Sequence, residues 1–447
     1  MDLAADESVD EGAVVIAANG NDGPDPNTVG SPACSFNSIG VGDWDDMNNP
    51  NIMGNISASS SRGHTLFDGT LKPDIIALGT RINSPDNIIN YADFSGTSAA
   101  APVVSGAAGL VLQAHPEYSP VEVKASLLVG AKWNPTNVTD IPSNSTGYEV
   151  GGSADLTLNA VGLGLLDVNR TLTLTNTGKN IIHDVITENQ TKKYSFSANQ
   201  GEQVKVILAW LKHPLANVTS PFDVSTSNLN FVINRSDTGV HVINGTSLLQ
   251  NNEFAVFNAP ITGSYTITVS APSVAPEIGS TEIFALASTH EITKVSLLVK
   301  EGTFTKTTAT GNQNVTGIGF KPKALLLFTT RQATQGTTDI YNLAFGFSNG
   351  SSSRSIGVQS NDNAATSNAG RAFGTQALRI LSSGTPTVTA QANVTSFNSD
   401  GFTLNWTTND STASIIHYIA LGGNATTNAS VSSFVANTTT GNQAVPV

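Results

Sequence analysis

The sequence predicts an α/β segment followed by two all-β domains of the sandwich or jelly-roll kind. In the first 170 or so residues, short apolar runs alternate with helix-like segments, as in a partial parallel sheet covered by helices. From about residue 172 the helical signals end, and short period-two segments follow between Gly, Pro and Asn breaks. We therefore predict an α/β segment at 1–172, β domains at 173–297 and 298–424, and a flexible tail at 425–447.

The elements of the α/β segment can be placed from local signals. A polar-faced helix ends at Gly12, and the apolar run AVVIAA that follows predicts a buried strand. SIGVGD and KPDIIALG predict two more strands, and residues 98–114 predict a helix of small residues. The next helix is expected to begin with Ser119 as N-cap and Pro120 in its first position. The segment 161–168 predicts a closing strand or turn.

The β domains are predicted from segments that alternate between apolar and polar residues. In the first domain these are 192–198, 203–210, 228–235, 252–259, 263–271 and 282–289. In the second they are 323–330, 341–348, 354–360, 376–383, 402–408 and 414–423. Two of these strands carry tryptophan. Trp210 and Trp406 are expected to be core residues rather than exposed platforms for sugar rings.

Composition excludes several classes of protein. The net charge of −13 and the pI of about 4.8 argue against a nucleic-acid partner, which would need a basic surface. A single cysteine allows no intrachain disulfide. We find no apolar run of about 18 residues, so no membrane span is predicted.

The sequence also carries signs of export. Its start, MDLAADESVDEGAVV, lacks the basic and apolar regions of a signal peptide. Yet Asn-x-Ser/Thr sequons are dense, for example at Asn137, Asn217 and Asn314, as on an exported, glycosylation-tolerant surface. We expect an extracellular or cell-surface protein whose signal peptide is absent from this chain.

Ser98, in YADFSGTSAAAP, is placed at the start of a helix. There it lies beside unpaired amides and the positive end of the helix dipole, which suit an oxyanion that forms next to its hydroxyl. Taken alone, the residue is an ordinary helix N-cap. A nucleophile elbow is excluded, because that motif needs Gly where this sequence has Ala100.

The neighbouring blocks change this interpretation. GTSAAAP with the helix that follows, VVIAANGNDG, SPACSFNSIGVGDWDD and SSRGHTLFDGTLKPDIIALGT resemble, in this order, blocks of the subtilisin-like serine proteases over about residues 1–170. The resemblance implies acyl transfer from polypeptide substrates, with Ser98 as the nucleophile. Asn21 and the Ser98 N–H would form the oxyanion hole, and the stretch Ala17, Ala18, Asn19, Gly20 would line one wall of the specificity pocket.

The sequence departs from the family in one respect. In that family the catalytic Asp and His precede the oxyanion asparagine, and here Asn21 stands almost at the start. The chain is therefore expected to be the C-terminal part of a longer precursor and a very poor protease alone. In subtilisin itself, loss of the base lowers turnover by about 10⁶. His64 is expected to be a loop residue, His115 a helix-end residue, and Asp74 and Asp93 structural or solvated.

Two other functions stay open. One is a non-catalytic extracellular adhesion or binding protein with a degenerate peptidase domain; the other is a protease that uses His64 as its base. Residues 190–271 resemble the β-sandwich that follows the catalytic domain in some subtilisin-like proteases.

The resemblance implies no catalytic cofactor and no catalytic metal. It makes calcium a candidate structural ion, with Asp223, Asn251 and Asn252 only speculative ligands. The last β domain suggests contact with a cell surface or a polysaccharide.

Overall fold

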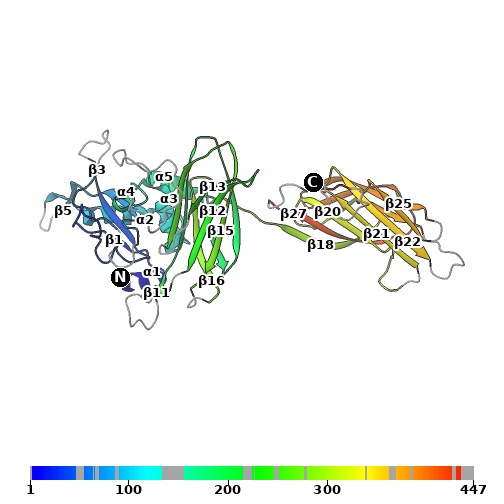
Figure 1. The fold of residues 1–447 in the computed structure, drawn as a ribbon, viewed down its shortest axis with the longest axis horizontal. Helices are drawn as coiled ribbons and strands as arrows, with labels where there is room; N and C mark the ends of the chain where they lie inside the picture. The colour runs from blue at the N-terminus through cyan, green and yellow to red at the C-terminus, as the bar shows by residue number, and fades with distance from the viewer. Residues whose placement is uncertain are drawn as a thin grey trace, which may run out of the picture. The chain divides into compact units, whose positions relative to one another are not determined.

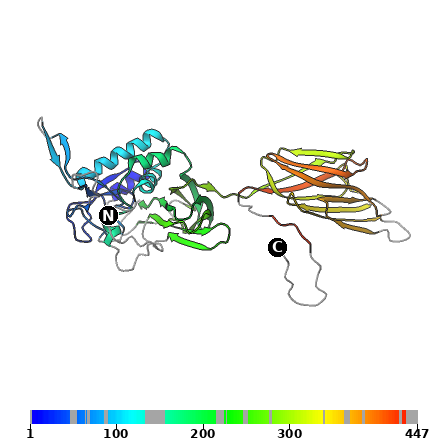
Figure 2. The ribbon, with the colours of Figure 1, turned by 90° about the horizontal axis from the view of Figure 1, so that it is seen from above.

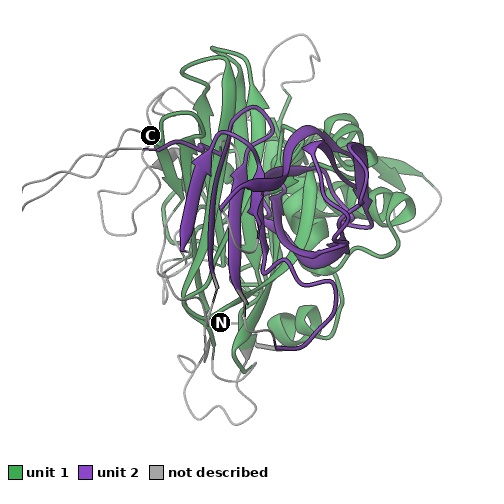
Figure 3. Cartoon of the chain, turned by 90° about the vertical axis from the view of Figure 1, so that its right-hand side faces the viewer, with its two compact units in different colours: residues 1–294 green, residues 295–447 purple. Residues whose placement is uncertain are grey.

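The computed structural model describes residues 3–46, 55–63, 65, 70–85, 90–132, 156–214, 224–225, 227–245, 251–275, 279–337, 340–361, 369–382, 386–424 and 429–433. The chain divides into two compact units, residues 1–294 and 295–447 (Figure 3). Of the predicted tail at 425–447, only 429–433 lies within the described residues. The predicted boundary between the α/β segment (1–172) and the first β domain (173–297) falls inside the first unit and stays a prediction.

The first unit opens with a small parallel sheet. The strand β2 (Ile39–Asp45) is central and pairs in parallel with β1 (Ile16–Ala18) and β4 (Ile75–Leu78). The short β3 (Asn55–Ile56) pairs with β2 antiparallel, and β5 (Ile82–Pro85) forms a hairpin with β6 (Tyr91–Phe94). All three predicted parallel strands are present; the first is shorter than the apolar run that predicted it.

The same part of the first unit contains helices. They are α1 (Leu3–Asp10), α2 (Thr97–Ala114), α3 (Pro120–Gly130), α4 (Leu156–Val161) and α5 (Val168–Asn176). The long α2 packs on β1, β2 and β4 (Figure 2). At the start of α3 the N–H and hydroxyl of Ser119 both donate to the Glu122 carboxylate, at 2.9 and 2.7 Å, which confirms the predicted cap.

The end of the helical part was predicted too early. Helical signals were expected to vanish from about residue 172, but α5 continues to Asn176. Its sequence VNRTLTLTN alternates like a strand, yet Asp167 caps it by accepting from Arg170 N–H, and it packs on α2 and α3. Tertiary packing thus overrides the strand signal given by the alternating pattern and the β-branched threonines.

The rest of the first unit is a sandwich of two sheets. One sheet has the order β13-β12-β15-β8-β17, and the other has the order β14-β9-β16-β7 (Figure 1). The bounds of their strands are β7 Ile181–Thr187, β8 Thr191–Ala198, β9 Gln203–Trp210, β12 Asn228–Arg235, β13 His241–Gly245, β14 Asn252–Asn258, β15 Gly263–Ser273, β16 Thr281–Ser288 and β17 Thr293–Lys294. A short pair, β10 (His213–Pro214) and β11 (Val224–Ser225), lies outside both sheets.

The second sheet of this sandwich is buried on both faces. Along β9, Val206 and Trp210 point into the sandwich core, while Ile207 and Ala209 join the core beneath α2 and α3. Alternate side chains of one strand therefore serve two hydrophobic cores. Through β9 and β16 this sheet packs against α3, and α3 packs against α2, the helix that contains Ser98.

The second unit is a sandwich of its own. Its larger sheet has the order β18-β27-β20-β21-β22-β23, and its smaller sheet has the order β19-β26-β25-β24. The bounds are β18 Leu298–Thr305, β19 Gly311–Thr316, β20 Pro322–Thr329, β21 Ile340–Ser348, β22 Ser353–Asn361, β23 Gly370–Gly374, β24 Leu378–Leu381, β25 Val388–Asn398, β26 Gly401–Thr408 and β27 Ile415–Gly422. Trp210 in the first unit and Trp406 in this one are fully buried, so both tryptophans are core residues as predicted.

One described helix, α2, is long and apolar enough to cross a membrane by length and composition. A buried core helix meets the same criterion, and α2 packs against three strands and two other helices.

Candidate active site

Ser98 lies in the first turn of α2 and is exposed, while Thr97 and Ala99 on either side of it are buried. The helix follows Gly96, whose φ of +123° favours glycine. A Cβ at Gly96 would lie 3.0 Å from Asn21 Oδ1, so glycine also lets the two segments approach closely. The turn thus presents the Ser98 hydroxyl to solvent at the start of a long helix that is buried on one face.

Asn21 follows β1 and is exposed, and its amide has a defined orientation. Its Oδ1 accepts from the Thr97 backbone N–H at 3.0 Å and from the Thr97 hydroxyl at 3.1 Å. A backbone N–H can only donate, so the atom beside it must be the oxygen. The Nδ2 group of Asn21 therefore stays available to donate to an acceptor from outside the protein. The residue that holds this amide, Thr97, directly precedes Ser98 in the chain.

Thr97 is a residue that the sequence analysis missed. Its hydroxyl donates to Asn21 and accepts from the Gly20 N–H at 3.2 Å, which ties the turn after β1 to the start of α2. Ser61 supports the same turn, since its N–H donates to the Gly20 carbonyl and its hydroxyl accepts from Asp22 N–H. The only sequence signal for this role was the position of Thr97 between Gly96 and Ser98.

Electrostatics at this point favour a negative charge. The first N–H groups of a helix carry its positive partial charge and lack intrahelical acceptors. Among the described residues, no carbonyl accepts from Ser98 N–H and no side chain is hydrogen-bonded to Ser98 Oγ. One backbone donor and one amide donor are therefore free beside a solvent-exposed hydroxyl, which is the donor set an oxyanion hole needs.

The residues predicted to line the pocket, 17–20, cover the end of β1 and the turn. Ala17 is buried, and Ala18 is half-buried at the end of the strand. The Asn19 side chain is buried and donates to Ser61 O at 2.7 Å, so it faces the protein interior. Of these four residues, only Ala18 and Gly20 have surface beside the turn.

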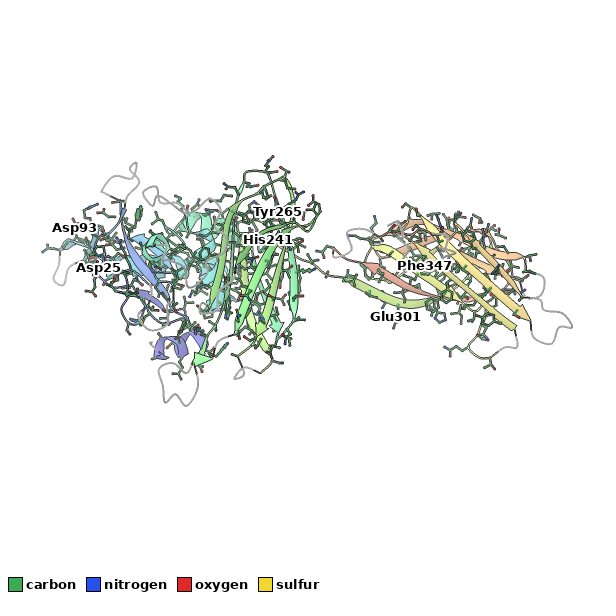
Figure 4. All side chains as sticks on the ribbon, in the orientation of Figure 1. Asp25, Asp93, His241, Tyr265, Glu301 and Phe347 are labelled. Atoms are coloured by element: carbon green, nitrogen blue, oxygen red, sulfur yellow. The ribbon has the colours of Figure 1, made fainter. Side chains whose placement is uncertain are left out.

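No general base is found next to Ser98 in the described part of the chain. His64 lies outside the described residues. His115 is at the C-terminal end of α2, where its Nδ1 pairs with Glu117 at 3.1 Å and its ring stacks on Tyr118. Asp93 is exposed on the β5–β6 hairpin (Figure 4).

Asp74 is a structural residue, buried in a cluster of charges. Its carboxylate pairs with Lys72 at 2.6 Å and with Lys124 at 3.2 Å, and it accepts from Gly40 N–H at 2.7 Å. Burial alone would raise the pKa of Asp74, but the two lysines outweigh it and lower that pKa. Burial lowers the pKa of Lys124 to about 8 in spite of Asp74. The cluster joins the segment before β4 to α3 and to β2.

Asp223, Asn251 and Asn252 are the predicted candidate ligands of a structural ion, and Asn252 is the buried first residue of β14 rather than a loop residue. Asp223 lies outside the described residues. Asn251 is buried and donates to Asn37 Oδ1 and Trp210 O, so its amide nitrogen holds protein groups together. Within the part of the chain that the structure describes, no group of three or more His, Cys, Asp or Glu side chains is placed to hold a metal ion.

The geometry thus combines an exposed serine, an oriented amide and a free backbone N–H at a helix start, as in serine hydrolases. Residues 1–164 match the model of the subtilase family of peptidases. This stretch contains Asn21, Thr97 and Ser98.

Curated relatives also match part of the chain. Serine protease AprX of Bacillus subtilis (strain 168) is 41% identical over 146 residues, which are 29% of this chain and 33% of AprX. The membrane-bound transcription factor site-1 protease of Homo sapiens is 34% identical over 129 residues, 27% of this chain and 12% of that protein. Among solved structures, the S41 psychrophilic protease aligns with a TM-score of 0.29 at 30% identity, over 37% of this chain and 52% of that one. The chain spans a third or less of the length of these two curated relatives.

Proposed function

We propose that this chain carries the nucleophile and the oxyanion hole of a subtilisin-like serine endopeptidase that acts on polypeptides outside the cell. One observation carries the proposal. Two hydrogen bonds from Thr97 hold the oxygen of the Asn21 amide, which leaves Nδ2 as a donor beside Ser98. An amide fixed in this way needs no reorganisation when an oxyanion forms.

The proposed chemistry is acyl transfer. The Ser98 oxygen attacks the carbonyl carbon of the scissile peptide and gives its proton to a general base. The carbonyl π electrons move to oxygen, and Asn21 Nδ2 and the Ser98 N–H donate to this oxyanion. Collapse of the tetrahedral intermediate breaks the C–N bond, and the base returns its proton to the leaving amine. Water then cleaves the Ser98 ester by the same steps.

The backbone of residues 17–20 is proposed to form one wall of the pocket for the substrate side chain. The segment runs from β1 directly into Asn21, so a side chain seated against it lies beside the oxyanion donors. Because the side chains of Ala17 and Asn19 face the interior, only the backbone and the small surfaces of Ala18 and Gly20 would contact substrate.

The base is the missing part of this mechanism. The described residues place no histidine or carboxylate in hydrogen-bond reach of Ser98 Oγ. We therefore expect very low peptidase activity from these 447 residues alone and propose that catalysis requires a base and an orienting acid from elsewhere. Added imidazole can take the place of a histidine base, which makes the nucleophile and the oxyanion hole testable without the rest of the triad.

The experiment measures hydrolysis of a peptide p-nitroanilide by the 447-residue chain, with and without imidazole. We expect an imidazole-dependent rate that is lost in Ser98→Ala. Asn21→Ala is expected to lower this rate by about 10²–10³, the range known for loss of one such donor in subtilisin. The Ser98→Ala chain also corrects for hydrolysis by imidazole itself.

Each outcome separates the candidate functions. If imidazole gives no rate that depends on Ser98, the proposal is wrong and a non-catalytic binding protein is favoured. A substantial rate without imidazole that His64→Ala removes would instead make His64 the base. We expect His64→Ala to leave the imidazole-dependent rate unchanged.

A further inference from the structure

The larger sheet of the second unit has an unusual outward side. The pairing register aligns one residue from each strand in a row across the sheet: Thr303, His417, Phe328, Phe345, Ile356 and Phe373. We call the side of the sheet that carries this row the outer face. His417 stacks on Phe328 with ring centroids 5.1 Å apart, and Phe328 contacts Phe345.

The outer face exposes large apolar side chains on adjacent strands. The exposed fraction is 56% for Tyr341, 42% for Phe345 and 39% for Phe347 on β21, 52% for Ile356 on β22, and 68% for Phe373 on β23. Figure 4 shows Phe347 on this sheet. A single exposed hydrophobic residue needs no explanation, but a contiguous group on neighbouring strands marks an interaction surface.

Packing on the inner side excludes a register in which these side chains point inward. The inward positions of β21 and β22 hold small or polar residues, such as Gly346 and Gly357. A Cβ at Gly346 would lie 1.6 Å from Ala377 O, and one at Gly357 would lie 2.8 Å from Arg379 O. A shift of one residue would bring phenylalanines to positions where only glycine fits. The apolar outer face is therefore fixed by the packing of the two sheets.

Charges stand at opposite edges of the sheet. Glu301 is exposed on the edge strand β18, and Arg371 is exposed on the opposite edge strand β23. Arg354, on the neighbouring strand β22, pairs with Phe347 and stands at the same level along the strands as Glu301, whereas Arg371 pairs with Val358, four residues further along β22. Within the described residues, neither Glu301 nor Arg354 has an ion-pair partner, and Arg354 donates hydrogen bonds to Ser353 O and Ser433 Oγ.

We propose that the outer face binds the outer face of a second copy of this chain, related by a two-fold axis parallel to the strands. This rotation lays β18 of one copy over β23 of the other. Glu301 then lies near the partner subunit's Arg354, which stands at the same level along the strands, and the same contact recurs at the other edge. The arrangement is self-complementary, as a two-fold interface must be. Two sheets packed face to face also bury their apolar side chains as in a sandwich core.

The size of the outer face suits a stable dimer. Six strands at about 4.8 Å spacing and about eight residues at 3.3 Å each give a surface of roughly 750 Å². A standard interface buries about 800 Å² on each partner. Aliphatic residues such as Leu326 and Ile419 fill the space between the aromatic rings, and charges stand at the edges. This chemistry fits another apolar protein surface better than a polysaccharide, which needs polar groups among the rings.

The test is sedimentation velocity of the full 447-residue chain over a range of concentrations. We expect a monomer–dimer equilibrium that Ile356→Glu weakens at least about 30-fold. Val240→Glu is the matched control, because Val240 is 54% exposed and lies in the first unit; it is expected to leave the equilibrium unchanged. A wild-type chain that is monomeric at all concentrations would overturn the proposal, as would a dimer insensitive to Ile356→Glu.

Charge reversal tests the partner and the orientation. Glu301→Arg alone and Arg354→Glu alone each place like charges at both contacts, so each is expected to dimerise more weakly than wild type. Mixing the two restores opposite charges at both edges, and we expect a heterodimer tighter than either homodimer. Equal weakening in the mixture would contradict the proposed axis. Binding of wild-type chain to an insoluble polysaccharide that Ile356→Glu abolishes, without dimerisation, would assign the outer face to a sugar instead.

Discussion

Replacing Thr97 by valine tests how the oxyanion donor is oriented. Valine keeps the shape of this buried side chain but removes the hydroxyl that donates to Asn21 Oδ1 at 3.1 Å and accepts from Gly20 N–H at 3.2 Å. The half-buried Gly20 N–H then loses its acceptor, which costs about 1 kcal/mol of stability. The Asn21 amide keeps only its bond from the Thr97 N–H. Losing a bond worth about 1 kcal/mol lowers the population of the oriented amide about fivefold.

The assay combines thermal unfolding with the imidazole-dependent hydrolysis rate. We expect Thr97→Val to lower both the melting temperature and the rate. Thr97→Ser is the matched variant: it keeps the hydroxyl and removes a buried methyl group, so it should lower the melting temperature but leave the rate near wild type. If the serine variant loses as much rate as the valine variant, the hydroxyl does not orient the amide and the reasoning is wrong.

Three further changes have expected outcomes. Gly96→Ala puts a Cβ 3.0 Å from Asn21 Oδ1 at a φ of +123°, so we expect a loss of about 1–3 kcal/mol in unfolding free energy and a lower imidazole-dependent rate. Burial would lower the pKa of His213, but its hydrogen bond to Glu282 and nearby carboxylates raise it. The stabilisation that protonated His213 gives is therefore complete below about pH 6.5 and is lost as pH rises through the folded-state pKa. We expect His213→Gln to reduce this pH dependence of the unfolding free energy, measured by urea titrations at several pH values. Asp74→Asn leaves two buried lysines without their carboxylate and should cost about 3–5 kcal/mol, measured by urea unfolding; a loss below 1 kcal/mol would contradict the ion-pair cluster.

Most elements could be predicted because their signals are local. The cap at Ser119, the continuous apolar strands and the period-two segments each depend on neighbouring residues, and the structure contains them. The α5 helix could not be found this way, since Thr-Leu alternation favours a strand and only its packing on other helices makes it helical. The sequence predicts strands at 192–198 and 203–210, but no local signal shows that the side chains of β9 enter two hydrophobic cores.

Part of the candidate site could likewise be predicted from local sequence and part could not. Ser98 and Asn21 could be proposed because each lies in a block with a recognisable pattern. The link between them could not be proposed, because Thr97 and Gly20 are 77 residues apart and only the fold brings them together. The outer face of the second unit is a further case. The alternation along β21 indicates a strand, and the pattern alone would place its larger apolar residues in the core. The backbone of Ala377 lies so close to Gly346 that only glycine fits on the inner side, so the larger residues lie on the outer face.

The central claim is that Ser98 is a nucleophile held beside two oxyanion donors. The most direct measurement is to incubate the chain with a fluorophosphonate in the presence of imidazole and to locate the adduct by peptide mass spectrometry. Displacement of fluoride by a serine oxygen leaves a stable phosphonyl ester. The account predicts one adduct, on Ser98, formed much more slowly in Asn21→Ala. An adduct on other serines, or labelling of Ser98 that does not depend on Asn21, would contradict it.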